Sequence, residues 1–83
     1  MVKLFFDRQI DVHGYYLEDA IYELEEILFC SHSESILIIH GHGSGILKNG
    51  LRKFIRNNPH IKSYEFGENL NLPGGGGVTV VWT

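Results

Sequence analysis

The sequence lacks most features that mark a membrane, secreted or disordered protein. It has one cysteine among 83 residues, so no disulfide can form within the chain. Its apolar runs are short, such as Ile36–Ile39, whereas a membrane-spanning helix needs about 20 apolar residues. The apolar run at the start is also too short for a signal peptide. We therefore expect a cytoplasmic protein without a membrane partner.

Acidic residues are absent from one long stretch, although the formal net charge is -3. No acid lies between Ser35 and Tyr64, and that stretch carries five cationic side chains: Lys48, Arg52, Lys53, Arg56 and Lys62. Most of the acids precede it. Such asymmetry is typical of a face that binds an anionic partner, but ordinary scatter of charge explains it equally well.

Two segments have the apolar spacing of amphipathic helices. The first runs from Leu17 to Leu28 and has an acidic opposite face. The second follows a glycine-rich loop, with Ser44 as the expected N-cap. It carries apolar residues from Leu47 to Ile55 on one face and a basic stripe on another, formed by Lys48, Arg52 and Arg56.

Short runs rich in β-branched residues predict strands between and after these helices. We expect strands at 10–12, 36–39, 61–66 and 78–82, and a loop at 67–77. The predicted order is β-α-β-α-β-β in one domain, residues 1–83. The fold class is an α/β two-layer sandwich, a four-stranded mixed sheet with two helices. Its core covers about residues 8–83, and residues 1–7 form an N-terminal arm or strand.

The first motif that could carry chemistry is Asp11-Val12-His13-Gly14, at the end of a predicted strand. Residues two apart in a strand point to the same side, so the carboxylate of Asp11 can lie beside the imidazole of His13. A carboxylate selects the tautomer of a neighbouring imidazole and supports acid–base catalysis. For an isolated Asp-x-His, a buried turn-capping Asp and an incidental His are the simpler interpretation.

The second motif, from His40 to Gly45, places three glycines and two histidines between a strand and a helix. Glycines allow close approach to a ligand, and a helix N-terminus suits phosphate. The loop matches neither a P-loop nor the full dinucleotide fingerprint. Asp11, His13, His40 and His42 also raise the possibility of zinc. Gly74–Gly77 alone indicates only backbone freedom, as in a linker.

These motifs together resemble the Smr (small MutS-related) domain. Ile10–Gly14 is similar to its Leu-Asp-Leu-His-Gly motif, and His40–Gly45 to its His-Gly-Lys-Gly-x-Gly motif. Asn58-Pro59 and Gly75–Val81 follow later landmarks of the family in order. The resemblance implies a fold like the C-terminal domain of translation initiation factor three, and an endonuclease that binds nucleic acid.

The resemblance also implies roles for particular residues. Asp11 and His13 match the family positions linked to cleavage. The glycine loop is linked to substrate contact, which maps to His40, Gly41, His42, Gly43 and Gly45. Two positions depart from the family: His42 stands where Lys or Arg is usual, and Lys48 where Arg is usual, so a bidentate phosphate contact becomes a point charge.

The sequence thus predicts phosphodiester cleavage, on RNA rather than on branched or duplex DNA. Asp11 orients His13, which acts as base and acid together with His42 or His40. The loop amides, Ser44, Lys48 and Arg52 hold phosphates. This requires the first motif to lie beside the glycine loop.

Several alternatives stay open. The chain could be a non-catalytic module that binds nucleic acid or the ribosome, or a metal-binding regulatory domain. It could be part of a larger MutS-like protein. Cleavage of RNA needs no cofactor, since the 2′-hydroxyl is the nucleophile, but a divalent cation stays open.

Overall fold

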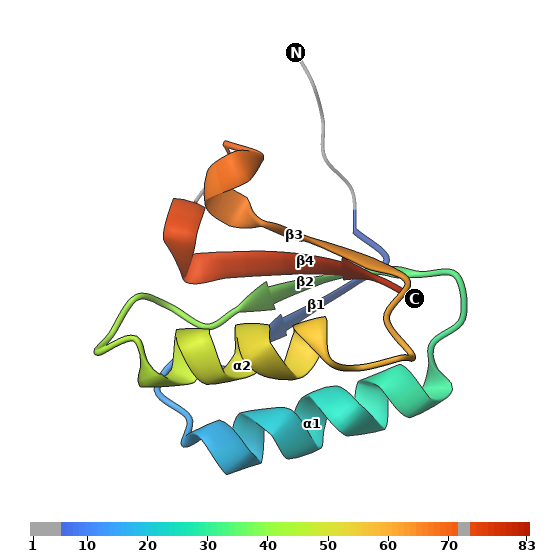
Figure 1. The fold of residues 1–83 in the computed structure, drawn as a ribbon, viewed down its shortest axis with the longest axis horizontal. Helices are drawn as coiled ribbons and strands as arrows, with labels where there is room; N and C mark the ends of the chain where they lie inside the picture. Colours follow the sequence, from blue (N-terminus) through green and yellow to red (C-terminus); the bar gives the residue numbers. More distant parts are fainter. Residues whose placement is uncertain (1–5, 72–73) are drawn as a thin grey trace.

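The structure, a computed structural model, describes residues 6–71 and 74–83 (Figure 1). It confirms the predicted β-α-β-α-β-β order. The elements are β1 (Arg8–Asp11), α1 (Leu17–Cys30), β2 (Ser35–Ile39), α2 (Ile46–Arg56), β3 (Ser63–Phe66) and β4 (Val78–Trp82), with short 3-10 helices η1 (Gly67–Asn69) and η2 (Gly75–Gly77) between the last two strands. Most of the expected N-terminal arm, residues 1–5, lies outside the described residues.

The four strands form one mixed sheet in the order β1-β2-β4-β3. β1 and β2 are parallel, and β4 is antiparallel to both β2 and β3. In the register, Asp11 lies beside Ile39, and Ile39 lies beside Val78. The ends of β1 and β2 and the start of β4 therefore meet at one edge of the sheet, which is on the left in Figure 1.

Both helices cover the same face of the sheet, which makes the two-layer sandwich (Figure 1). The core lies between the layers, and Leu24, Ile36, Ile38 and Leu51 are fully buried there. A smaller apolar cluster is centred on β4, at Val78 and Val80. None of the described helices has the length and apolar character needed to cross a membrane.

The loop before α2 differs from the sequence-based expectation. Ser44 does not cap the helix: the N-cap is Gly45, whose φ of 91° is in the left-handed region. The left-handed turn delays the start of the helix by one residue, and no side chain caps it. Parts of the expected loop at 67–77 form short 3-10 helices, η1 and η2, which the sequence did not predict.

Candidate active site

Three segments far apart in the sequence meet at the edge where β1 and β2 end. A β-carbon added to Gly41 would lie 3.4 Å from the β-carbon of His13. The N–H of Gly41 donates to the carbonyl of Gly77 at 2.9 Å, and the N–H of His40 donates to the same oxygen at 3.0 Å. The Asp-x-His motif, the glycine loop and the four-glycine run therefore share one site. The first motif thus lies beside the glycine loop.

Asp11 and His13 form a hydrogen-bonded pair at the surface. One carboxylate oxygen of Asp11 accepts from the ring Nδ1 of His13 and from its backbone N–H, the latter at 3.1 Å. These bonds, chiefly the one from the ring, lower the pKa of Asp11. The His13 side chain is 70% exposed. In the neutral imidazole, Nδ1 carries the proton because it faces a carboxylate, and Nε2 then has a free lone pair.

His42 and Lys48 lie together against the glycine run. A β-carbon on Gly76 would lie 3.0 Å from the Lys48 Nζ and 3.5 Å from the His42 Cε1, and one on Gly77 would lie 3.2 Å from the His42 Nε2. Glycine is needed here for close approach, since any larger side chain would displace the imidazole and the ammonium. The imidazole of His42 and the ammonium of Lys48 thus lie together at the glycine run.

His40 is buried, with 3% of its surface exposed, in contrast to His42. Its Nδ1 lies 2.9 Å from the carbonyl of Gly41, and its Nε2 lies 2.9 Å from the hydroxyl of Thr79. A carbonyl only accepts, so Nδ1 donates, and Nε2 accepts from Thr79. Burial lowers the pKa of His40, aided by the positive charges of Arg52 and Lys48. His40 is therefore a neutral group that shapes the loop.

Arg52 is also buried, so α2 does not carry the exposed basic stripe that its spacing predicts. Its guanidinium donates to Glu68 at 2.8 and 3.0 Å, to the Thr79 hydroxyl at 3.0 Å and to the Val78 carbonyl at 3.1 Å. It lies 3.9 Å from the centre of the Phe66 ring. The bonds from Arg52 lower the pKa of Glu68 to about 2.

Arg52 and His40 belong to one hydrogen-bonded chain behind the glycine loop. Arg52 donates to the Thr79 hydroxyl, Thr79 donates to His40, and His40 donates to the carbonyl of Gly41. These hydrogen bonds connect Glu68 with the turn beside His13, and each buried side-chain polar atom among them has a partner. The hydrogen-bonded chain holds the loop in place from behind and makes no contact with solvent at its centre.

The remaining glycine-loop residues are at the surface. Gly43 and Ser44 are exposed, and Gly41 and Gly45 are half-buried. Within the described residues, the N–H groups of His42, Gly43 and Ser44 donate to no protein acceptor. They precede the N-terminus of α2, which has no acid in its first turn. Free amides and the positive end of a helix dipole favour an anion here.

The four-ligand zinc arrangement that the sequence raised is not formed. Both ring nitrogens of His40 are engaged by protein groups, and the Nδ1 of His13 is engaged by Asp11. In residues 6–71 and 74–83, no group of three or more His, Cys, Asp or Glu side chains is arranged to hold a metal ion.

Sequence reasoning missed two contributions to this site. The run Gly74–Gly77 predicts only a linker, whereas Gly76 and Gly77 lie against His42 and Lys48; four glycines in a row beside a predicted strand are a usable signal. Glu68 and Thr79 carried no local signal at all, because their importance depends on contact with Arg52 across 16 and 27 residues.

The fold and the site define a small two-layer α/β domain with a histidine-containing glycine loop at the end of its parallel strands. The family model described as the Smr domain matches residues 10–83. The chain belongs to the Smr domain family, as the motifs predicted.

Solved and curated proteins agree with this assignment. The crystal structure of the Smr domain of Thermus thermophilus MutS2 superposes with a TM-score of 0.76 at 26% identity, covering 90% of this chain and 95% of that one. Endonuclease MutS2 of Clostridioides difficile is 42% identical over 76 residues, which is 88% of this chain and 9% of that protein. Endonuclease MutS2 of Caldanaerobacter subterraneus is 39% identical, over 87% of this chain and 9% of its own length. The chain thus spans about a tenth of the length of these two endonucleases.

Proposed function

We propose that this chain binds nucleic acid and cleaves its phosphodiester bonds, with RNA as the preferred substrate. One observation carries the proposal: the exposed Asp11–His13 pair lies beside the glycine turn at Gly41, and the residues that follow this turn include His42 and, in α2, Lys48. Imidazoles, an ammonium and backbone amides without a protein acceptor are groups that can catalyse phosphodiester transfer. The relatives named Endonuclease MutS2 support the cleavage part of this proposal.

His13 acts as the general base. Asp11 holds the proton on Nδ1, so the exposed Nε2 takes the proton from the 2′-hydroxyl of a bound ribose. The 2′-oxygen then forms a bond to phosphorus while the bond from phosphorus to the 5′-oxygen breaks. His42 in its protonated form donates to the departing 5′-oxygen. The products are a 2′,3′-cyclic phosphate and a 5′-hydroxyl, and no metal is required.

The glycine loop and Lys48 hold the phosphate during this step. The amides of His42, Gly43 and Ser44 and the start of α2 supply hydrogen bonds, and Lys48 supplies a positive charge beside Gly76. Gly41, Gly45 and the hydroxyl of Ser44 shape this cradle. Arg52 and His40, which the sequence assigned to substrate contact, act instead as positioning residues because they are buried.

DNA lacks the 2′-hydroxyl, so its cleavage would use water as the nucleophile, and a divalent cation would help to activate it. Binding without cleavage is the second candidate, since the amides and Lys48 hold phosphate whether or not His13 is poised to react. A partner role on the ribosome, a place within a larger MutS-like protein and a cytoplasmic location fit this proposal and are part of it.

The test uses end-labelled RNA, the same RNA with 2′-deoxy sugars, and supercoiled DNA, each with and without a chelator. Wild type should cleave RNA in chelator and leave a cyclic phosphate. His13→Ala should slow cleavage by about a hundredfold or more. His32→Ala is the matched control, because that exposed histidine lies at the other end of α1, and it should retain full activity. Full activity in both His13→Ala and Asp11→Ala would refute the assignment. Binding with no product from any substrate would favour the binding module.

A further inference from the structure

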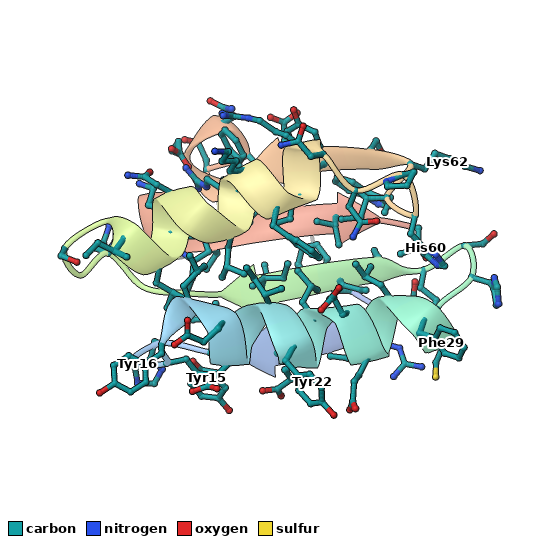
Figure 2. All side chains as sticks on the ribbon, turned by 60° about the horizontal axis from the view of Figure 1, so that its bottom comes forward. Tyr15, Tyr16, Tyr22, Phe29, His60 and Lys62 are labelled. Carbon is teal, nitrogen blue, oxygen red and sulfur yellow. The ribbon has the colours of Figure 1, made fainter. Side chains whose placement is uncertain are left out.

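The outer side of α1 exposes large aromatic side chains that the proposed cleavage site does not use. Phe29 is 82% exposed, Tyr22 64% and Tyr15 42%, and Tyr16 at the helix start is 77% exposed. Figure 2 shows all four along the side of α1 that faces away from the sheet. Scattered exposed aromatics are ordinary, but several in one row are typical of a surface that binds a partner.

Three of these aromatics, Tyr15, Tyr22 and Phe29, form a stripe with a spacing of seven residues. Tyr22 and Phe29 are seven residues apart, which is about two helical turns, and Tyr15 precedes Tyr22 by the same interval in the turn before the helix. An open groove of about 450 Å³ lies between Tyr22 and Phe29, lined also by Glu25, Glu26 and Cys30. A row of this period fits the side chains of a second helix laid along α1.

The charge around the stripe is all of one sign. α1 contains five acids, which are Glu18, Asp19, Glu23, Glu25 and Glu26, and no Lys, Arg or His. The carboxylate of Glu26 lies close to the hydroxyl of Tyr22 and raises the pKa of that phenol. The acids therefore border the aromatic row directly. Phosphate groups are repelled by this surface, whereas cationic side chains are attracted to it.

We propose that the outer face of α1 is a docking surface for a basic amphipathic helix of a partner protein. Leucine-like side chains of the partner would cover Tyr22 and Phe29, and its Lys and Arg would pair with Glu25 and Glu26 at the groove. A second copy of this chain docked through the same face would place acids against acids. The stripe begins two residues after His13, so the bound partner lies beside the proposed cleavage site.

The test is an NMR titration of the labelled chain with three synthetic helical peptides of about 18 residues, long enough to follow α1. One has a leucine face and a lysine face, the second has serine in place of leucine, and the third has glutamate in place of lysine. The first should bind one to one and shift the signals of Tyr22 and Phe29. The other two should bind at least about tenfold more weakly.

Variants separate docking from non-specific charge attraction. The double variant Tyr22→Ala and Phe29→Ala should bind the leucine–lysine peptide more weakly by about tenfold or more. The reason is that an aromatic anchor at an interface contributes at least that much to affinity. Both side chains are exposed, so the fold should persist, and the spectrum reports it. Tyr64→Ala on β3 is the control and should bind as wild type. Unchanged binding by the double variant, or equal binding of the serine peptide, would overturn the proposal. So would self-association through α1.

Discussion

Replacing Arg52 by methionine tests how the buried arginine supports the fold. The side chain is 7% exposed and makes four hydrogen bonds, of which those to Thr79 and to the Val78 carbonyl are in the interior. Methionine has a similar length and keeps the contact with Phe66, but it donates no hydrogen bond. The variant therefore removes the donors and leaves the packing largely in place.

The expected loss in the free energy of unfolding follows from the buried acceptors that lose their donor. A buried acceptor that loses its donor costs about 1–3 kcal/mol. Two such acceptors remain, the Val78 carbonyl and the Thr79 hydroxyl, and Thr79 keeps its bond to His40. Glu68 is 44% exposed and returns to water, so it adds no comparable loss. We expect Arg52→Met to lower the free energy of unfolding by about 3 kcal/mol, or roughly 15 °C in Tm for a domain of this size.

Urea and thermal unfolding followed by circular dichroism measure this loss. Arg56→Met is the matched control, since Arg56 is exposed and lies 5.3 Å from the same Phe66 ring. It should change stability by less than about 0.5 kcal/mol. If the two variants lose the same free energy of unfolding, the hydrogen bonds of the buried guanidinium do not stabilise the fold. The stabilising role of the hydrogen bonds that connect Glu68 with Gly41 is then wrong.

Three further outcomes are expected. Stability should fall as the pH drops below about 6.5, because His40 has a lowered pKa in the folded state and the unfolded chain takes up the proton first; in His40→Gln this fall should be smaller. Gly76→Ala should reduce RNA cleavage about tenfold with little change in Tm, because its β-carbon would lie 3.0 Å from the Lys48 Nζ. Leu24→Ala, at a fully buried core position, should cost about 2–5 kcal/mol.

Each of these has an opposing result. An identical pH profile of stability for wild type and His40→Gln would show that His40 titrates normally in the folded chain. A Gly76→Ala variant that cleaves as wild type would place Lys48 outside the site. Phe29→Ala is the control for the core variant, since Phe29 is 82% exposed, and it should stay within about 0.5 kcal/mol of wild type.

Much of the fold could be predicted from local patterns. The helical spacing of Leu24 and its neighbours, and the β-branched run at Ile36–Ile39, located α1 and β2 within a few residues. The Asp11–His13 pair was also predictable from its spacing, although β1 ends at Asp11 and the pair forms in the turn that follows, where Asp11 accepts from the backbone N–H of His13. The N-cap of α2 was not predictable, because Ser44 and Gly45 both suit that position. The left-handed backbone conformation places Gly45 there.

The sequence by itself determined the order of elements and the Asp11–His13 pair, because each of these depends on residues close together along the chain. Only the tertiary structure decided that Arg52 and His40 are buried and that Gly76 and Gly77 border the site. The physical reason is that burial and close approach are set by strand order. Placing β4 between β2 and β3 brings Thr79 under α2, and nothing in the spacing along the chain specifies that neighbour.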